Sequence, residues 1–445
     1  MISPIDHHLI ELRKRGVDIN AAVDALISLT VAPDTPTTVI PTGFTLNPDQ
    51  AHALEKIKLW LESDEQYFAL RGFAGTGKST LMKELSKLGY NFYFSAPTNK
   101  ATKVLSEFLG VKSKTTYSLL GLRMVAEEDK RVLSSTEAPD LGANPILVID
   151  EAGMLQKNLV KLLVELGHRV LFVGDPAQIN PIGEIVSRAW RLAGRNKVTL
   201  RKVERFDNEL LQLSTSLRDC LKNKIWRSPI KDSNNGEEGV FVLPRPKFEE
   251  AMLSLKLEDW DTTKVCCWRN RTVEGYNNII REALGFTDDY HVGERILLAS
   301  PLAPMGNILA YTDEEFVIKG ISRRIFGFET FEIDAYVFDV DRDFVLHVPV
   351  DPTAYARHAS RLASIASLEK NSMARKVAWK AYWSFVETFS AVRYGYALTA
   401  HRLQGSTVQN IFVDQSDILA NPNKPEAFRC LYVAATRPKR SLVTF

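Results

Sequence analysis

The chain has 445 residues, of which 45% are hydrophobic and 25% are charged, and its formal net charge is +2. This length is sufficient for two or three domains with buried cores, and the composition excludes a disordered, fibrous or membrane-embedded chain. Because the net charge is near zero, any surface for nucleic acid has to be a local basic stripe.

The spacing of the four cysteines indicates the redox environment of the protein. They show no CxxC spacing, so we expect reduced core residues of a cytosolic protein instead of a metal cluster or redox motif. Two of them are adjacent, and neighbours on a strand point to opposite faces of its sheet. The four are Cys220, Cys266, Cys267 and Cys430.

Residues 1–43 differ from the rest of the chain. Scattered apolar positions indicate one or two short helices, and a Pro/Thr-rich stretch at 31–38 predicts an extended linker. The start of the chain lacks a basic segment followed by an apolar core, and no apolar run is long enough to span a membrane. We therefore expect a loosely packed leader, a main body from Phe44, and a cytoplasmic protein with no membrane partner.

A glycine-rich stretch at 72–80 fits the P-loop pattern of two glycines five positions apart followed by Lys and Ser. An apolar strand at 67–70 precedes it and a helix follows it, and in this context backbone amides cradle phosphate oxygens. Lys78 is expected to reach the β- and γ-phosphates, and Ser79 to bind Mg²⁺. The residues predicted to contact the nucleotide are Gly72, Gly75, Thr76, Gly77, Lys78, Ser79 and Thr80.

Strands and helices alternate from this point to about Arg205, which predicts a parallel sheet wrapped by helices. We assign one nucleotide-binding domain to residues 44–205. A polar stretch at about 121–144 interrupts the alternation and predicts a small inserted hairpin. The expected strands are 67–70, 91–96, 146–149 and 170–173, and the expected helices are 78–88, 99–109 and 157–166.

Two of these strands end in polar residues that suit phosphate chemistry. Asp150 and Glu151 follow an apolar run in the Walker B pattern, in which the Asp holds Mg²⁺ and the Glu orients the attacking water. Gln178 follows the next strand and is expected to sense the γ-phosphate. Two acids at a strand end can simply cap a helix, but the upstream P-loop makes that explanation weak.

A second α/β series begins after Arg205 and is assigned to 206–290. Several β-like runs separated by Gly and Pro then predict a small antiparallel barrel at 291–350. A helical segment at 354–389 and three strands complete the second domain over 351–445. The expected elements are helices 208–221, 248–257 and 271–284 and strands 240–243, 264–268, 396–398, 411–413 and 442–444.

Six motifs, in this order, resemble those of superfamily 1 helicases of the RecD/Dda branch. The resemblance extends over about 46–445, which leaves out only the leader. The motifs are Gly-Phe-Ala-Gly-Thr-Gly-Lys-Ser-Thr at 72–80, Ala-Pro-Thr-Asn-Lys-Ala at 96–101, Asp-Glu-Ala at 150–152, Gly-Asp-Pro-Ala-Gln at 174–178, Thr-Ala-His-Arg-Leu-Gln-Gly at 399–405 and Tyr-Val-Ala-Ala-Thr-Arg at 432–437.

The resemblance implies an α/β fold with two RecA-like parallel-sheet domains, an inserted β-hairpin that acts as a pin, and an inserted small SH3-like β-barrel. It implies ATP and Mg²⁺ as cofactors. Gln50 matches a glutamine that reads adenine, and Arg205 and Arg437 match arginines that reach the γ-phosphate from the second domain. Gly405 is also assigned to the nucleotide site. The catalytic set is then Lys78, Asp150, Glu151, Gln178, Arg205 and Arg437, with Ser79 and Asp150 as metal ligands.

The resemblance also implies contacts to single-stranded DNA, made mainly by small hydroxyls and backbone amides that hold phosphate and sugar without reading bases. In the first domain the matching residues are Thr98, Asn99, Lys100, Thr115 and Thr116. In the second domain they are Thr399, His401, Gln404 and Gly405.

Three further positions are compared with phage members of the family. Trp383 matches a DNA-stacking tryptophan of phage members, although a core aromatic beside Tyr382 and Phe385 is about as good an explanation. Asn99 replaces a histidine of those members. The predicted hairpin carries Leu133, within Val-Leu-Ser-Ser, where they carry an aromatic residue, so strand separation depends on Leu133 or is weak.

These observations predict an ATP-dependent DNA helicase that translocates 5′ to 3′ on single-stranded DNA and unwinds forked duplex as a monomer. Candidate protein partners are a single-strand-binding protein or replication proteins. Three alternatives stay open: a translocase that displaces proteins or remodels forks with weak strand separation, a P-loop phosphotransferase acting on a small acceptor, and a non-catalytic nucleic-acid-binding scaffold.

Overall fold

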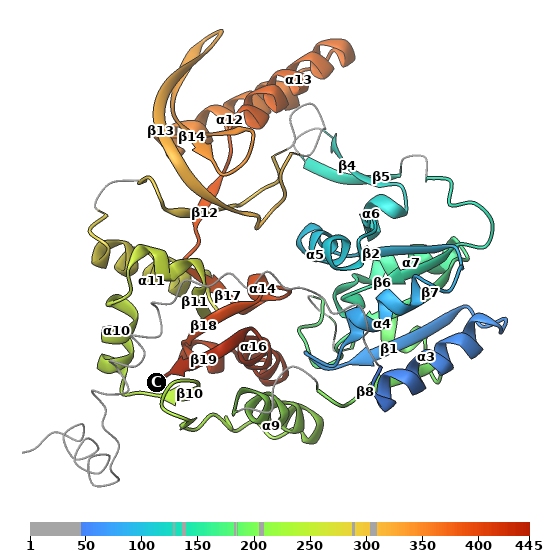
Figure 1. Ribbon diagram of the computed structural model, residues 1–445. Helices are drawn as coiled ribbons and strands as arrows, with labels where there is room; N and C mark the ends of the chain where they lie inside the picture. The colour runs from blue at the N-terminus through green and yellow to red at the C-terminus, as the bar shows by residue number, and fades with distance from the viewer. Residues whose placement is uncertain are drawn as a thin grey trace, which may run out of the picture.

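A computed structural model of the chain describes residues 46–127, 130–135, 139–181, 184, 186–203, 209–286, 290–302 and 309–445, with backbone only for 123–135. The predicted leader and Arg205 lie outside this part of the chain. Figure 1 shows two α/β domains side by side, with further strands and two helices above them.

The first domain contains a six-stranded sheet in which every neighbouring pair is parallel, as the alternation predicted. Helices α3, α4 and α5 pack on one face, and α6, α7 and α8 pack on the other. The strand order is β3 (Lys114–Thr115), β2 (Phe92–Ala96), β6 (Ile146–Ile149), β7 (Arg169–Gly174), β1 (Tyr67–Gly72) and β8 (Lys197–Leu200). The helices are α3 (Pro48–Leu61), α4 (Lys78–Leu85), α5 (Asn99–Leu109), α6 (Thr116–Leu119), α7 (Lys157–Glu165) and α8 (Arg188–Leu192).

The second domain contains another six-stranded sheet, parallel except at β9. Helices α9, α14, α15 and α16 pack on one face, and α10 and α11 pack on the other. The strand order is β17 (Ala397–Thr399), β11 (Thr263–Cys267), β18 (Val408–Val413), β19 (Pro438–Thr444), β10 (Gly239–Val242) and β9 (Ser233–Asn234). The helices are α9 (Glu209–Asn223), α10 (Arg245–Leu253), α11 (Asn270–Ala283), α14 (Ala400–Leu403), α15 (Gln415–Leu419) and α16 (Lys424–Thr436).

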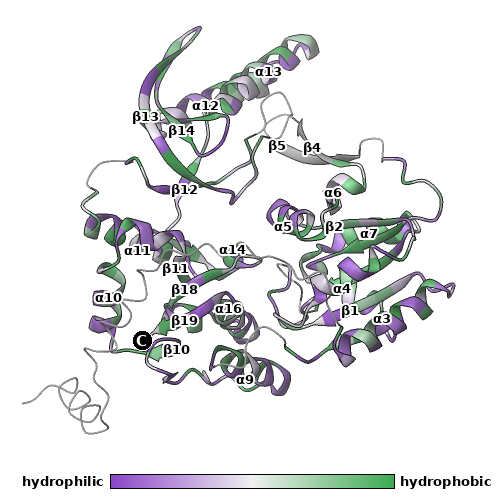
Figure 2. Ribbon diagram, viewed as in Figure 1, coloured by the Kyte–Doolittle hydropathy of each residue, from purple (hydrophilic) through white to green (hydrophobic). Residues whose placement is uncertain are grey.

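The second domain confirms the prediction that the cysteines are core residues. All four cysteines are buried and none forms a disulfide. On β11, Cys266 belongs to the core beneath α9 and α16, whereas Cys267 belongs to the core beneath α10 and α11. The strands of both sheets are largely hydrophobic, as Figure 2 shows, because helices cover both of their faces.

The region predicted as a barrel is a five-stranded antiparallel sheet between β11 and β17 in the chain. Its order is β15 (Val345–Pro349), β14 (Phe331–Val340), β13 (Glu315–Phe328), β12 (Arg295–Leu298) and β16 (Val392–Tyr394). The outer half of the long β13–β14 hairpin packs on α12 (Pro352–Leu368) and α13 (Ser372–Thr388) through Phe328, Phe331 and Phe385. Closure of this sheet into an SH3-like barrel stays a prediction.

A separate two-stranded hairpin lies where the polar insertion was predicted. Its strands are β4 (Leu122–Glu127) and β5 (Lys130–Ser135), and Met124 pairs with Leu133. In Figure 1 the hairpin stands above α5 and α6, on the same side of the molecule as α12 and α13. Among the helices of the described residues, none combines the length and hydropathy needed to cross a lipid bilayer.

Three differences from the sequence-based elements have local causes. The helical segment predicted at 354–389 is two helices, because Asn371 caps α13 by accepting hydrogen bonds from two backbone amides. Helix α3 was missed, although its capping box of Asn47 and Gln50 is a recognisable start signal. Helix α16 was missed because a run of eight buried residues, Ala427–Ala435 with Arg429 as its exception, has no amphipathic period.

Candidate functional site

The P-loop joins β1 to α4 at the carboxyl edge of the first sheet. Gly75 and Gly77 have φ of 79° and 80°, a left-handed conformation that glycine adopts without strain. A Cβ on Gly77 would lie 2.1 Å from Nε2 of Gln50. Gln50 donates from this nitrogen to the Thr76 carbonyl at 3.2 Å, while its Oε1 accepts from the Asn47 amide at 3.1 Å. Gln50 therefore supports the P-loop directly.

Lys78 lies across the P-loop and bonds to its carbonyl groups. Its Nζ donates to the carbonyls of Gly72 at 2.8 Å and Phe73 at 3.0 Å. The Phe73 carbonyl also accepts from the hydroxyl of Thr76 at 2.9 Å. The carbonyls of the loop therefore hold the ammonium of Lys78 in place.

Two acids follow β6 and face Lys78. The Asp150 carboxylate accepts a hydrogen bond from the Glu151 amide at 2.9 Å, and Glu151 has a left-handed φ of 49°. Burial raises the pKa of Asp150, and the charge of Lys78 opposes that shift. Burial and the neighbouring Asp150 together raise the pKa of Glu151 to about 7. A carboxyl group that titrates near neutral pH is suited to general-base catalysis.

The tip of β7 is held by the second domain. The buried Tyr432 hydroxyl donates to Asp175 Oδ2 at 2.6 Å, and Arg429 donates to the carbonyls of Pro176 at 2.8 Å and Gln178 at 2.6 Å. The side chain of Gln178 accepts from Nε2 of Gln404 at 2.9 Å. Burial, then Asp175, raises the pKa of Tyr432 well above its ordinary value, so its hydroxyl stays a donor. The second domain thus grips the segment that carries Gln178.

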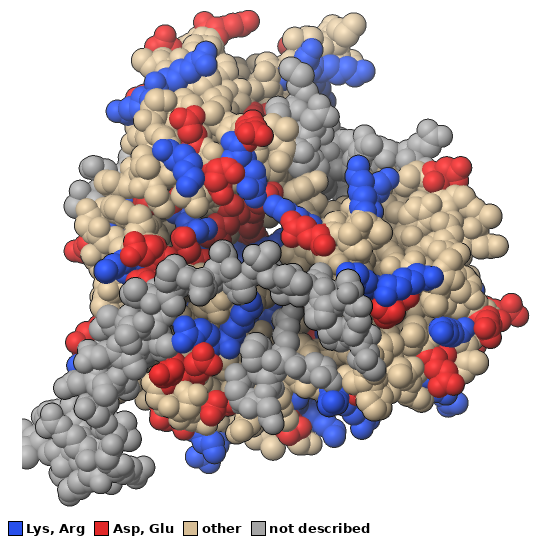
Figure 3. All heavy atoms as spheres, viewed as in Figure 1, with Lys and Arg blue, Asp and Glu red and all other residues tan. Residues whose placement is uncertain are grey.

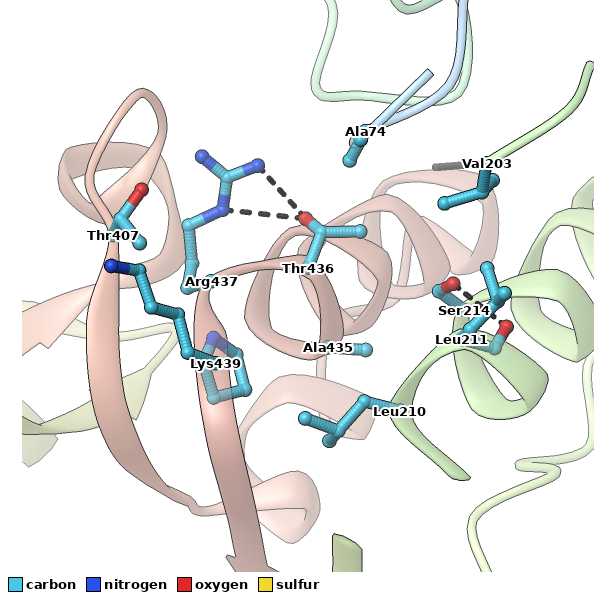
Figure 4. Close-up of a pocket in the computed structure, with 12 residues that line it drawn as sticks. Ala74, Val203, Leu210, Leu211, Ser214, Thr407, Ala435, Thr436, Arg437 and Lys439 are labelled. Atoms are coloured by element: carbon cyan, nitrogen blue, oxygen red, sulfur yellow. Dashed lines mark hydrogen bonds between the residues drawn. The ribbon is translucent and has the colours of Figure 1, made fainter. Parts of the chain in front are cut away.

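Arg437 lies at the C-terminal end of α16, opposite the P-loop. Its guanidinium donates to the hydroxyl of Thr436 at 2.9 Å and to the carbonyl of Ser406 at 3.1 Å. A cavity of about 50 Å³ lies between the two domains here. In Figure 4 the guanidinium of Arg437 is held on Thr436, on the side of the cavity across from Ala74 of the P-loop. The cavity is lined by Ala74, Gly75, Val203, Leu210, Leu211, Ser214, Thr407, Ala435, Thr436, Arg437, Pro438 and Lys439.

A second contact between the domains lies on the α5 side. Thr98 caps α5 by accepting from the Ala101 amide at 3.3 Å, and Asn99 and Lys100 form the first turn. The ammonium of Lys100 donates to the hydroxyl of Ser406 at 2.5 Å. Part of the Lys100 side chain reaches solvent, but its amine is surrounded by protein. This desolvation lowers the pKa of the Lys100 ammonium, and the negative charge of Glu315 opposes the shift.

A groove of about 870 Å³ runs from α5 and α6 of the first domain to the segment 309–315 of the inserted sheet. Its walls carry lysines on the first domain and acids on the inserted sheet, and Lys103 lies 4.0 Å from Glu314. Figure 3 likewise shows cationic and anionic side chains interspersed over this face of the molecule. The charged lining residues are Lys100, Lys103, Glu107, Lys112, Lys114, Asp313, Glu314, Glu315 and Arg342.

The second-domain motif at 399–405 lies beside Gln178 and Ser406. Thr399 is nearly buried at the start of α14, and His401 Nε2 is 3.5 Å from a carboxylate oxygen of Glu426. Burial lowers the pKa of His401 below its ordinary value, with Glu426 opposing, so the imidazole is neutral at pH 7. Gly405 has a left-handed φ of 80°, which turns the chain toward Ser406. Gln404 and Ser406 connect this motif to the first domain through Gln178 and Lys100.

Four of the predicted DNA residues are placed differently from the rest. Thr116 is fully buried and its hydroxyl is 3.3 Å from that of Ser95, so its side chain is a core contact and not part of a DNA surface. Thr115 caps α6, and its hydroxyl accepts from Ser118. Trp383 is half-buried on α13 with its ring against Tyr382, in the inserted region. Leu133 lies on β5, where only the backbone is described.

Sequence reasoning missed the residues that join the domains. Tyr432 and Asp175 lie inside quoted motifs but received no role, and Arg429 lies three positions before Tyr432. No local signal distinguishes these side chains from ordinary core or surface residues. Their partners are more than 250 positions away in the chain, so only the tertiary fold brings them together.

Comparisons with known proteins match both domains. A family model described as an AAA domain matches residues 45–223, and one described as a UvrD-like helicase C-terminal domain matches 394–443. The ATP-dependent DNA helicase dda of Enterobacteria phage T4 is 26% identical and covers 88% of this chain and 97% of its own. ATP-dependent DNA helicase Pif1 of Bdellovibrio bacteriovorus is 24% identical over 84% of this chain and 82% of its own.

Two further matches are a sequence relative that covers part of the chain and a solved structure that covers most of it. The RecD2 DNA helicase of Deinococcus radiodurans is 32% identical over 31% of this chain and 18% of its own. Among solved structures, a Bacteroides Pif1 helicase in complex with ADP-AlF3 and single-stranded DNA superposes with a TM-score of 0.50 at 16% identity. It covers 90% of this chain and 92% of its own, and it supports the arrangement of two RecA-like domains.

Proposed function

Because this chain belongs to the Pif1, RecD and Dda group of superfamily 1 helicases, we propose that it is an ATP-dependent DNA helicase that translocates 5′ to 3′ along single-stranded DNA. The observation that carries the proposal is the junction between the domains. The P-loop, the two acids after β6 and the tip of β7 all face α16, and Gln178 is bonded to Gln404 of the second domain.

The residues around Lys78 fit a nucleotide with a magnesium ion. Ser79 and Asp150 supply hard oxygen ligands of the kind Mg²⁺ prefers, and the ion, when bound, neutralises charge on the phosphates. Lys78 contacts the β- and γ-phosphates, and Glu151 accepts a proton from the attacking water. Gln50 is assigned the adenine contact by its match to the family motif, and its side chain is bonded to the Thr76 carbonyl and the Asn47 amide.

Arg437 completes the site from the second domain. Its guanidinium stabilises negative charge on the transferring phosphoryl group once the domains close, and Arg205 is assigned the same task by its motif. The cavity between Ala74 and Arg437 lies where the two domains meet, so we propose that the domains move relative to each other as nucleotide enters and leaves. Hydrolysis is thereby linked to domain movement.

The same movement acts on a DNA strand. Thr98, Asn99, Lys100 and Thr115 belong to one domain and Thr399, His401 and Gly405 to the other, so opening and closing alters the spacing between two grips on the strand. The Lys100 ammonium bonds to Ser406 across this junction and exchanges that hydroxyl for phosphate when a strand is present. Trp383 is assigned a stacking contact with a base.

The proposal assigns roles to the inserted elements. The β4–β5 hairpin, with Leu133, is the pin at which the duplex separates, and the five-stranded sheet is an SH3-like insertion that closes the groove over the strand. The domain limits proposed are 44–205, 206–290, 291–350 and 351–445. The protein acts as a monomer, with a single-strand-binding protein or replication proteins as candidate partners.

The test compares forked duplexes that carry either a 5′ or a 3′ single-stranded tail. We expect strand separation that requires ATP, Mg²⁺ and the 5′ tail, and ATP hydrolysis that rises on addition of an oligonucleotide. Lys78→Ala is the control and is expected to lose about 100-fold or more in hydrolysis, because it removes the ammonium that is proposed to contact the β- and γ-phosphates.

The outcomes separate the alternatives. Unwinding from the 3′ tail contradicts the direction, and undiminished hydrolysis by Lys78→Ala contradicts the site. Oligonucleotide-stimulated hydrolysis without strand separation favours the translocase, which the absence of an aromatic residue from Val132-Leu133-Ser134-Ser135 also favours. Hydrolysis indifferent to oligonucleotide favours a phosphotransferase, and no hydrolysis favours a binding scaffold.

A further inference from the structure

An arginine outside the six motifs contacts the P-loop from the second domain. Arg218 lies on α9, and its guanidinium carbon is 3.9 Å from the centroid of the Phe73 ring. A guanidinium over an aromatic face at this distance is an attractive contact, because the planar cation meets the negative face of the ring. The second domain is therefore joined to the loop itself, next to the strand that leads into it.

Phe73 sets the position of the catalytic lysine. Its carbonyl accepts from Lys78 Nζ at 3.0 Å and from both the hydroxyl and the amide of Thr76, at 2.9 and 3.3 Å. A rotation of the Phe73 backbone therefore moves the oxygen on which Lys78 rests. The ring under Arg218 limits that rotation.

The other side of Arg218 is held by the second domain. Its Nη2 donates to the hydroxyl of Thr215 at 2.7 Å, and its positive charge lies close enough to the Tyr432 hydroxyl to oppose the burial that raises the pKa of that group. That hydroxyl donates in turn to Asp175 at 2.6 Å. Tyr432 lies on α16, the helix that ends at Arg437. Arg218 thus lies where the P-loop, the β7 tip and α16 meet.

We infer that Arg218 is a positioning residue for phosphoryl transfer: stacked on Phe73, it fixes how α16 and Arg437 approach Lys78. It contacts the loop and not the phosphate, so its loss should slow the chemical step and leave ATP binding nearly unchanged. This inference rests on the proposed function for its reaction, and on the contacts of Arg218 and Phe73 for its geometry.

The test is a double-mutant cycle on ATP hydrolysis, with Phe73→Leu, Arg218→Ala and the combination. We expect each single change to lower kcat about tenfold with KM for ATP changed less than about twofold, since small misplacements of reacting groups affect kcat. The combination should be no slower than Arg218→Ala alone. Phe73→Tyr keeps the ring and should lose less activity than Phe73→Leu. Lys222→Ala, one turn further along α9 and outside the site, is the matched charge control and should leave kcat unchanged.

Three results would overturn the inference. These are additive losses in the double variant, equal activity of Phe73→Leu and Phe73→Tyr, or an Arg218→Ala defect confined to KM. The Tm of each variant shows whether a loss reflects unfolding, and Phe73→Tyr against Phe73→Leu is the comparison least affected by it. The cycle is run without and with oligo-dT. If oligo-dT does not stimulate hydrolysis, only the proposed DNA-dependent function is contradicted, because the basal hydrolysis rate still tests the contact between Arg218 and Phe73. A chain that hydrolyses no ATP overturns both proposals.

Discussion

At the scale of single residues, the site depends on how burial changes ordinary side chains. Lys78 rests on two carbonyls of its own loop, and Tyr432 keeps its proton because it is buried beside Asp175. Glu151 is the clearest case, because burial and Asp150 both disfavour its charged form. A surface glutamate would be ionised at neutral pH and a weaker base.

The Glu151 environment predicts a pH dependence. Only the deprotonated carboxylate accepts a proton, so kcat/KM for ATP should rise between about pH 6 and about pH 8 with a midpoint near 7, since this ratio reports the free enzyme. Glu151→Gln should lower the ratio at least 100-fold and remove this rise. The measurement is an ATPase profile in buffers of constant ionic strength, and a profile that is flat or falls with pH over this range would contradict the assignment.

At the scale of elements, the P-loop shows how neighbouring segments fix a turn. The capping box of α3 places Gln50 against Gly77, so the start of one helix supports the loop that starts another. The left-handed glycines allow the turn, but the Gln50 contact with the Thr76 carbonyl holds it in one arrangement. Close packing at Gly77 is therefore a second reason why no side chain fits there.

This contact predicts that Gly77→Ala lowers the free energy of unfolding by more than backbone strain at a left-handed glycine alone would. The new Cβ would lie 2.1 Å from Gln50 Nε2, whereas a Cβ at Gly89, with φ of 74°, meets nothing within 4 Å. Gly89→Ala should cost about 1–2 kcal/mol of unfolding free energy from backbone strain. Gly77→Ala should cost more and weaken nucleotide binding, because Gln50 has to give up its hydrogen bond to the Thr76 carbonyl. Chemical denaturation and titration with a fluorescent ATP analogue measure the two effects, and equal losses at both positions would contradict the Gln50 contact.

At the scale of the whole molecule, buried polar contacts join the parts. The inserted sheet is fastened to the second domain by Lys264 of β11, whose side chain is 5% exposed and donates to Glu315 at 2.8 Å and to the Gly395 carbonyl at 2.7 Å. Arg295 extends this network by pairing with Glu315 and Asp261. Hydrogen bonds and ion pairs depend on direction, so these contacts fix the orientation of the inserted sheet relative to the second domain more tightly than apolar packing would.

Removing the ammonium tests this junction. Lys264→Met keeps the volume but leaves the Gly395 carbonyl without its donor and Glu315 with Arg295 alone. We expect a loss of about 2 kcal/mol, because a buried acceptor left unsatisfied costs about 1–3 kcal/mol. The Tm should fall by about 4–8 °C for a domain of this size. Lys231→Met, at an exposed lysine of the same domain, is the control, and an equal shift in both variants would show that the junction contributes nothing.

Much of the fold and the centre of the site were predictable because their causes are local. Strand and helix alternation predicted the parallel sheet of the first domain, and the P-loop pattern predicted the turn at Gly75 and Gly77. Elements without a local period were missed. Helix α16 contains a run of buried residues that only Arg429 interrupts, and β8 and β16 are short strands whose place depends on their neighbours. The sequence also did not predict that the Thr116 side chain is buried, because the burial of a side chain depends on the tertiary fold and not on the motif that contains it.

The sequence alone determined the chemistry of this protein, because phosphate binding needs glycines, a lysine and acids at fixed spacings that the chain displays directly. The tertiary structure decided how the two domains are joined. The contacts of Arg218 with Phe73, Tyr432 with Asp175, and Gln404 with Gln178 link residues more than 140 positions apart. Their energies depend on distance and burial, which exist only once both sheets have folded.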